Sequence, residues 1–347
     1  MTRKDVTALD SVQYLRAILV FLVVMDHAGI LISLEKYFGV SLIAPSVNYF
    51  GVVGVNIFFM ISGFIIIYTA TEKSSLSLVV SIPDFVKKRA VRLIPIMWVS
   101  IVAYAVLKRL GRGEWGEVNE YLTAFFLYPF SDINPTQLWT LRHEVYFYLV
   151  FALSMYFRRL WILLVGVWIF LPLWFYNQDS AVLSFFFSPF AFLFGVGVFA
   201  CILRKKIIKH LDVKKSKGLA AFLMFFGCVL VAYSCHVFEY THKHTISIMI
   251  FAVIASPIIF YTVMLPVTID GFFGKVLKLF GDASYSIYLF HGIFLSAIIG
   301  ILSRYKEYIN KWAAFSISVS LAMVLGVLVY LLIEKRLVAY LRTRFYL

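Results

Sequence analysis

Ten segments of this chain are apolar for long enough to cross a lipid bilayer as a helix, which needs about 20 residues. Inside a bilayer the backbone N–H and C=O groups must be paired within the chain, and a single apolar segment does this by forming an α-helix. Composition agrees, because 62% of the 347 residues are hydrophobic and only 14% are charged. We therefore predict an all-α polytopic membrane protein. The expected spans are residues 12–33, 47–70, 91–108, 138–157, 160–177, 181–203, 219–238, 246–267, 283–302 and 312–333.

The positive charge of the chain is distributed unevenly between the loops on its two sides. The net charge is +14, and with ten spans most of the 32 Lys and Arg fall on the side that holds both termini. Positive loops stay in the cytoplasm, so both termini are predicted to be cytoplasmic. This reading explains the basic charge without nucleic acid as a partner. The shorter apolar run 121–130 is expected to lie at the interface, because an eleventh span would remove the asymmetry.

Neither a linker nor a soluble segment of domain size interrupts the apolar pattern. We predict that residues 1–347 form a single integral-membrane domain with no fused soluble domain. No metal site is predicted. The residues considered for one were three cysteines within predicted spans, expected to be small buried hydrophobes, and a group whose spacing matches no known site: Cys201, Cys228, Cys235; His236, Glu239, His242, His244.

Two ionisable side chains share one face of the first predicted span. Arg16 and His27 are 11 residues apart, which on a helix is three turns and about 16 Å along the axis. An ionisable residue inside a span normally faces the bundle interior and marks a site or pathway. The alternative is that each side chain extends to the nearer membrane surface.

Other polar side chains extend this arrangement through the membrane. With the predicted topology, Glu144 lies near the depth of His27, and His291 lies closer to the middle. Arg89 and Arg92 are three residues apart at the cytoplasmic end of the third span, so they share a helix face. Simpler readings stay open: the arginines as topology anchors, Glu144 as a structural counter-ion and His291 as a hydrogen-bonded core residue.

Five motifs in collinear order resemble the acyltransferase 3 family of bacterial membrane O-acyltransferases, in particular the branch that acylates exopolysaccharides. They are LRAILVFLVVMDH (15–27), GVVGVNIFFMISGF (51–64), KKRAVRLIP (87–95), LWTLRHEVYFYL (138–149) and GDASYSIYLFH (281–291). The resemblance extends from the first predicted span to the ninth. Arg142 and His143 stand where smaller or uncharged side chains are common in that branch, so only Glu144 is carried over from its motif.

The resemblance implies transfer of an acyl group, most simply acetyl, from cytosolic acyl-CoA to a hydroxyl of an envelope glycan such as exopolysaccharide or O-antigen. It implies location in the bacterial inner membrane. The expected partners are acyl-CoA, a glycan or lipid-linked glycan acceptor, and membrane lipid, and no permanently bound cofactor is expected.

The residue types suit this chemistry. A neutral imidazole can take the proton from a hydroxyl, which makes His27 the candidate general base. Glu144 is expected to support the charged imidazole that forms, whereas Asp26 is a poorer candidate because sequence neighbours on a helix point in different directions. Guanidinium groups bind phosphate in bidentate fashion, so four cations are expected to hold acyl-CoA: Arg16, Lys88, Arg89 and Arg92.

Small residues of the second motif allow two readings. Ser62 could be the nucleophile of a covalent acyl-enzyme, but a small residue at a helix contact is the commoner case. Gly51, Gly54 and Gly63 are expected to allow close helix packing. A transporter or flippase for a glycan or lipid-linked intermediate is the alternative function, since such proteins also place ionisable groups at mid-membrane. The chain lacks the similar halves typical of that class.

Overall fold

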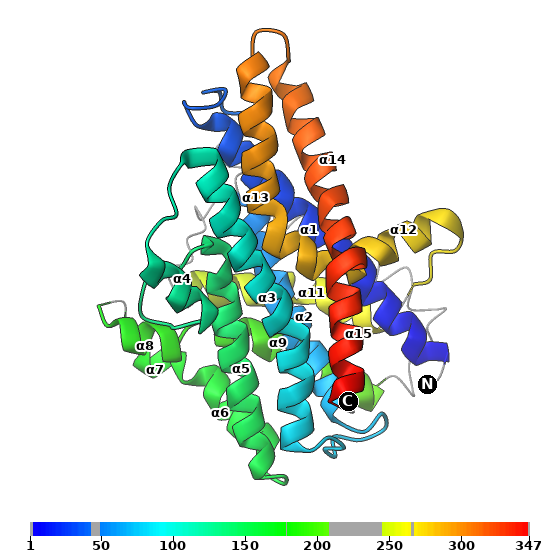
Figure 1. The fold of residues 1–347 in the computed structure, drawn as a ribbon. Helices are drawn as coiled ribbons and strands as arrows, with labels where there is room; N and C mark the ends of the chain where they lie inside the picture. The colour runs from blue at the N-terminus through cyan, green and yellow to red at the C-terminus, as the bar shows by residue number, and fades with distance from the viewer. Residues whose placement is uncertain (1–2, 43–48, 178, 208–244, 265–266, 346–347) are drawn as a thin grey trace. The chain divides into compact units, whose positions relative to one another are not determined.

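In the computed structural model, residues 3–42, 49–177, 179–207, 245–264 and 267–345 are described, and all secondary-structure statements concern these ranges (Figure 1). Apart from one bridge between Thr71 and Leu78, the described residues carry no β pairing. The predicted fold class, an all-α polytopic membrane protein, is confirmed. The helices are α1 (Arg3–Ser33), α2 (Phe50–Ala70), α3 (Ile82–Arg112), α4 (Val118–Phe125), η2 (Thr136–Leu138), α5 (Trp139–Tyr156), α6 (Trp161–Phe170), α7 (Pro172–Phe175), α8 (Ala181–Phe186), α9 (Phe190–Ile207), α11 (Thr245–Met264), α12 (Gly271–Asp282), α13 (Ser284–Leu302), η3 (Ser303–Tyr305), α14 (Lys311–Val329), η4 (Tyr330–Glu334) and α15 (Lys335–Arg344).

Seven helical segments within the described ranges are long and apolar enough to cross a membrane, and each coincides with a predicted span. They are Leu9–Ser33, Phe50–Ala70, Ile82–Gly111, Ala181–Ile207, Thr245–Met264, Ser284–Tyr305 and Lys311–Arg344. The predicted span 138–157 is helix α5. The predicted span 219–238 lies outside the described residues, together with Cys228, Cys235 and the His236–His244 group. The total of ten spans, the cytoplasmic termini and the single domain stay predictions.

Proline explains where the helices depart from the predicted spans. The predicted span 160–177 consists of α6 and α7, and Pro172 is the first residue of α7. The predicted span 181–203 consists of α8 and α9, with Pro189 directly before α9. Proline has no N–H to continue a preceding helix but fits the first turn of a new one. The interfacial run 121–130 contains only the short helix α4, which is about 12 Å long.

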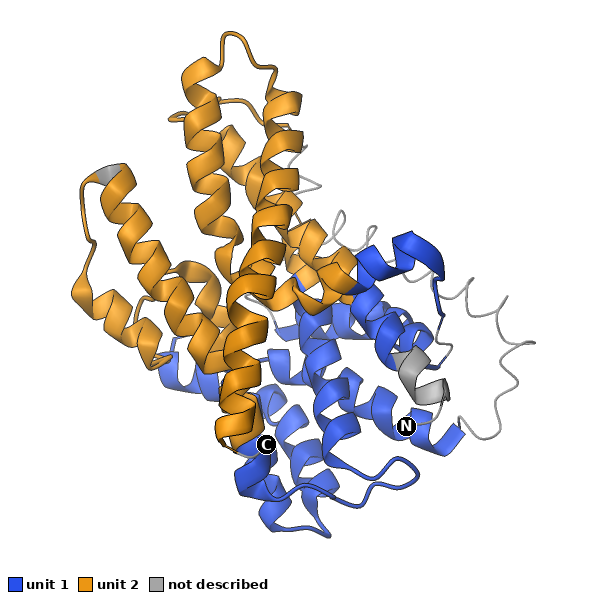
Figure 2. Ribbon diagram, turned by 45° about the vertical axis from the view of Figure 1, so that its right-hand side comes forward, with its two compact units in different colours: residues 1–15, 55–86, 143–278 blue, residues 16–54, 87–142, 279–347 orange. Residues whose placement is uncertain are grey.

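The chain divides into two compact units, each described here by itself (Figure 2). Unit 1 comprises residues 1–15, 55–86 and 143–278, and unit 2 comprises residues 16–54, 87–142 and 279–347. Helices α1, α2, α3, α5 and α12 each contribute to both units.

Aromatic rings and glycine contacts form the core of unit 1. The Phe147 ring stacks on Phe194 at 4.2 Å between centroids and on Trp168 at 5.5 Å. A Cβ on Gly63 would lie 2.1 Å from the Phe194 carbonyl oxygen, and one on Gly197 would lie 1.8 Å from the Met60 carbonyl oxygen. Helices α2 and α9 therefore meet backbone to backbone, and the prediction of close packing at Gly63 is confirmed.

Unit 2 is built around α13, which runs beside α14 (Figure 1). A Cβ on Gly326 of α14 would lie 2.7 Å from Ile287 Cγ1 of α13. Gly54 likewise allows α2 to pack closely against α1, since a Cβ at this position would lie 2.7 Å from Val23 Cγ2. Close packing at Gly54 is thereby confirmed as well. On another side, Leu289 and Phe290 of α13 share a buried apolar cluster with Ile96 and Ile101 of α3 and Leu138 and Leu141 near the start of α5.

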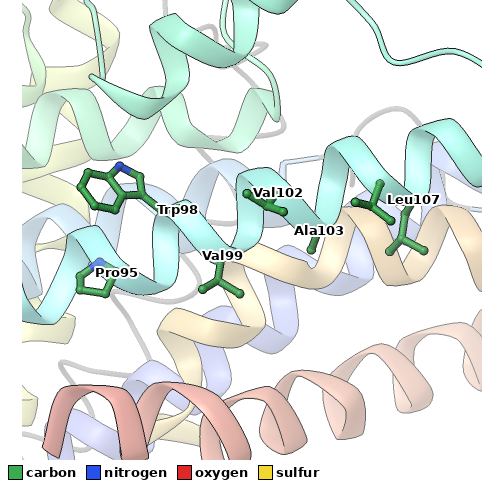
Figure 3. Close-up of a pocket in the computed structure, with 7 residues that line it drawn as sticks. Pro95, Trp98, Val99, Val102, Ala103 and Leu107 are labelled. Atoms are coloured by element: carbon green, nitrogen blue, oxygen red, sulfur yellow. The ribbon is translucent and has the colours of Figure 1, made fainter. Parts of the chain in front are cut away.

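An apolar hollow lies along α3 between Pro95 and Leu107 (Figure 3). Its lining residues are all hydrophobic, and Trp98 and Val102 are about half exposed. A surface without charged or hydroxyl groups suits hydrocarbon but cannot hold phosphate or sugar. The lining of the hollow therefore suits a hydrocarbon chain better than the phosphate or sugar groups of a substrate.

Candidate functional site

The two histidines predicted as site residues in unit 2 lie against each other. His27 of α1 and His291 of α13 have ring centroids 4.9 Å apart in an edge-to-face arrangement with 74° between the ring planes. His291 is almost fully buried, with 1% of its surface exposed, and His27 is half-buried. Residues 264 positions apart in sequence are thus joined into one imidazole pair.

Hydrogen bonds to the backbone determine the tautomer of both rings. His27 Nδ1 lies 2.9 Å from the Val23 carbonyl oxygen, and His291 Nδ1 lies 2.6 Å from the Tyr288 carbonyl oxygen. A carbonyl oxygen can only accept, so each Nδ1 carries a proton and donates it. In the neutral rings the lone pair therefore resides on Nε2. The Nε2 atom of each neutral imidazole is therefore the one that can accept a hydrogen bond or a proton.

The carboxylate of Asp26, the sequence neighbour of His27, packs against α2 at Gly51. A Cβ on Gly51 would lie 2.6 Å from Asp26 Oδ2, so the absence of a side chain at Gly51 makes room for the carboxylate. This confirms close packing at Gly51. Asp26 is buried, and its Oδ1 has no hydrogen-bond partner among the described residues. That Asp26 is a poor orienting group for His27, its sequence neighbour, stays a prediction.

Glu334 is a buried carboxylate that the sequence did not indicate as a site residue. The charges of both arginines act on Glu334, and both also act on the Tyr330 hydroxyl. Glu334 accepts a hydrogen bond of 2.5 Å from the hydroxyl of the fully buried Ser286. Arg16 itself is only 6% exposed. Two of the three arginines expected to bind the donor, Arg16 and Arg92, therefore act electrostatically on the same carboxylate in unit 2.

Glu334 lies in a π-helical turn. Residues Tyr330–Glu334 form η4, which separates α14 from α15. Such a turn contains one extra residue, so the side chains after it point in a different direction around the helix axis. It is common at functional sites. The sequence signal was a lone carboxylate directly after an apolar run that ends at residue 333, followed by Lys335 and Arg336. That position resembles an ordinary flanking charge.

The remaining candidates for donor binding lie at the start of α3. Lys88 is exposed and Arg89 is half-buried. Arg89 and Arg92 are on one continuous helix, as predicted from their spacing. Their contact with a phosphate stays a prediction.

The predicted carboxylate Glu144 and the predicted alternative nucleophile Ser62 belong to unit 1, where they form a hydrogen bond. Ser62 Oγ donates to Glu144 Oε1 at 3.0 Å, and the Tyr148 hydroxyl donates to the same oxygen. Two donors on one oxygen hold the carboxylate in a fixed orientation. The role of Glu144 as a support for His27 stays a prediction.

Other buried polar groups of unit 1 are used in packing. The Lys205 ammonium donates to Thr71 Oγ1 at 2.6 Å, to the Ser75 carbonyl oxygen at 3.2 Å and to the Glu72 carbonyl oxygen. His143 is surrounded by aromatic rings, with Phe185 at 4.9 Å and Phe190 at 5.0 Å between centroids. Cys201 is fully buried, as predicted. No group of three potential metal ligands occurs among the described residues.

An all-α membrane chain that brings two histidines together, and in which two arginines act on one buried carboxylate, has the features of a membrane-embedded group-transfer enzyme. A family model described as an acyltransferase domain matches residues 9–331. The chain therefore belongs to the acyltransferase 3 family, as its motifs indicated.

Part of the chain is similar in sequence to one curated protein. The chain is 30% identical over 161 residues to the exopolysaccharide production protein ExoZ of Rhizobium meliloti (strain 1021). The match covers 43% of this chain and 49% of ExoZ, so the chain spans about half the length of the curated relative it matches. No solved structure matches the chain significantly.

Proposed function

We propose that this protein is a bacterial inner-membrane O-acyltransferase that moves an acyl group, most simply acetyl, from acyl-CoA to a hydroxyl of an exopolysaccharide or related envelope glycan. The observation that carries the proposal is the His27–His291 pair, in which both Nδ1 protons are donated to the backbone. Family membership supports acyl transfer. The name of the relative supports an exopolysaccharide as the acceptor class.

In the proposed reaction His27 is the general base. Its Nε2 takes the proton of the acceptor hydroxyl while the hydroxyl oxygen attacks the thioester carbonyl carbon. The tetrahedral intermediate collapses, the C–S bond breaks, and the CoA thiolate leaves. The imidazolium returns its proton to the thiolate, so the products are an ester and CoA, and His27 is neutral again. His291, whose Nε2 also holds a lone pair, is the proposed partner of the charged ring.

The acyl-CoA donor is proposed to bind along the part of α1 between Arg16 and His27. Arg89, Arg92 and Lys88 would hold the CoA phosphates, because guanidinium groups match phosphate oxygens in pairs. From Arg16 to His27 the helix rises about 16 Å along one face, which suits an extended pantetheine arm with the thioester at its end. In this scheme Glu334 keeps Arg16 and Arg92 in place between turnovers.

The direct test uses the purified full chain in lipid nanodiscs with acetyl-CoA and de-acetylated exopolysaccharide. We expect release of CoA together with formation of an ester on the glycan, measured by mass spectrometry. A deletion strain should lack the same acyl mass on its envelope glycan. Failure to release CoA from any acyl-CoA, combined with glycan flux across vesicles that contain the protein, would establish the transporter function instead.

A further inference from the structure

Arg142 carries a buried guanidinium edge that nothing in the described structure uses. It lies in the first turn of α5, and 9% of its surface is exposed. Its Nε and Nη2 atoms are buried, and neither has a hydrogen-bond partner among the described residues. The charge of Asp132 reaches Arg142, but Asp132 is exposed and makes no hydrogen bond to either atom. Leaving charged donors buried without acceptors is costly, so such donors are expected to meet a ligand.

The two unused atoms define the shape of that ligand. Nε–H and Nη2–H lie on the same edge of the planar guanidinium and point in the same direction. Two parallel donors match the two oxygens of a single carboxylate, which is the side-on form of the bidentate Arg–carboxylate pair. A lysine ammonium at this position could supply the charge but not the paired geometry.

The backbone that carries Arg142 is fixed to α13, the helix that carries His291. Gln137 Nε2 donates to the Leu289 carbonyl oxygen at 2.8 Å, and the Thr140 and Tyr288 hydroxyls are 2.9 Å apart. The Tyr288 ring in turn lies 5.7 Å from the ring of His291. Arg142 follows Thr140 by two residues and belongs to the same unit as the histidine pair. A site on a backbone held in this way is organised before the ligand arrives.

We infer that Arg142 is a specificity-determining residue that binds a carboxylate on one of the two substrates. The inference rests on the proposed acyl transfer for the identity of those substrates. The carboxylate could belong to a uronic acid of the acceptor glycan or to a dicarboxylic acyl group such as succinyl on the donor. Both present the same planar pair of oxygens to the guanidinium edge.

Binding is measured first, because it does not depend on turnover. Thermal unfolding of the full chain in nanodiscs is followed with glucuronate, with succinate and with glucose as a neutral probe. We expect a carboxylate to raise the melting temperature of the parent protein and glucose to leave it unchanged. The stabilisation should disappear in Arg142→Ala. It should persist in Arg109→Ala, a control that removes an exposed arginine of α3 in the same unit.

Turnover then distinguishes the source of the carboxylate. Acetyl-CoA is compared with succinyl-CoA, and a glucuronate-containing oligosaccharide is compared with the same oligosaccharide after carboxyl reduction. Arg142→Ala should lower kcat/KM about 10- to 100-fold for the pairs that include the recognised carboxylate, and leave the others near the parent value. A loss confined to succinyl-CoA assigns the carboxylate to the donor. A loss confined to the acidic oligosaccharide assigns it to the acceptor.

The result that overturns the inference is an equal effect of Arg142→Ala on acidic and neutral substrates, or no stabilisation of the parent protein by either anion. If Arg142→Ala does not fold, Arg142→Lys decides, because it keeps the charge and should still lose most of the preference for the acidic substrate. A parent protein that transfers no acyl group to any acceptor refutes the proposed function, while the melting experiment still judges Arg142.

Discussion

Buried polar groups are treated differently in the two units. In unit 1 the Lys205 ammonium is consumed by three oxygen atoms of one connecting segment, and His143 lies among phenylalanine rings. In unit 2 each histidine of the pair donates through Nδ1 and keeps a lone pair on Nε2. The Nε and Nη2 atoms of Arg142 have no hydrogen-bond partner among the described residues. Burial alone therefore does not identify a functional residue. A buried charged group whose hydrogen-bonding capacity is unused is a stronger indication of function.

The largest difference is expected between His27 and His143. His27→Ala should reduce turnover by about 10² to 10⁴, the usual share of acid–base catalysis, while acyl-CoA binding persists. His143→Ala removes a ring from an aromatic contact in unit 1 and should lower the melting temperature with little change in turnover. CoA release and thermal unfolding are measured on both variants. Comparable turnover in the two variants would remove His27 as the general base.

A smaller difference is expected between the arginines of α3 and Lys205. A charge-assisted contact to phosphate contributes about 1.5–3 kcal/mol, so Arg89→Ala and Arg92→Ala should each weaken acyl-CoA binding by about 10- to 100-fold. Arg92→Lys should recover only part of the loss. Lys205→Met should instead reduce stability, because it releases the segment from Thr71 to Ser75.

Calorimetric titration with CoA and with dephospho-CoA measures the phosphate contribution directly. High salt should weaken binding to the parent protein, since the exposed Lys88 indicates a site open to solvent. If both arginine-to-alanine variants bind CoA as tightly as the parent protein, the arginines serve only as topology anchors.

Glu144 belongs to unit 1 but is predicted to support His27 of unit 2. A variant of Glu144 therefore tests whether the buried polar groups of unit 1 serve packing alone. Glu144→Gln keeps the shape but removes the charge, and turnover should fall by about tenfold while donor binding persists. Steady-state kinetics with a separate donor-binding measurement distinguishes these two effects. An acyl group trapped covalently on Glu144 would contradict the supporting role.

The smallest effect is expected at Ser62, whose hydroxyl donates to Glu144. If Ser62 is only a small residue at a helix contact, Ser62→Ala should keep nearly normal turnover. Intact-protein mass spectrometry after incubation with acetyl-CoA checks the same point. Complete loss of activity together with loss of an added acetyl mass would instead identify Ser62 as the nucleophile.

The sequence indicates individual candidate residues better than it indicates their partners in space. Arg16, His27 and His291 are detectable because an ionisable side chain contrasts with an apolar span, and Gly51, Gly54 and Gly63 because small residues recur within a motif. The pairing of His27 with His291 could not be predicted, because it depends on how α1 and α13 pack.

Two further features escaped detection for physical reasons. Glu334 is placed by a π-helical turn, and a periodicity of 3.6 residues assigns the wrong direction to any residue after such a turn. Arg142 departs from the usual pattern of the family, and the burial of its Nε and Nη2 atoms without hydrogen-bond partners among the described residues is visible only in three dimensions.

The hydrogen bonds of the two histidines have a consequence for motion. Val23 lies on the same helix as His27, and Tyr288 on the same helix as His291, so each ring takes its orientation from its own helix. A relative shift of α1 and α13 would carry each ring along with its own helix. The distance between the imidazoles could then change while the lone pair of each neutral ring stayed on Nε2.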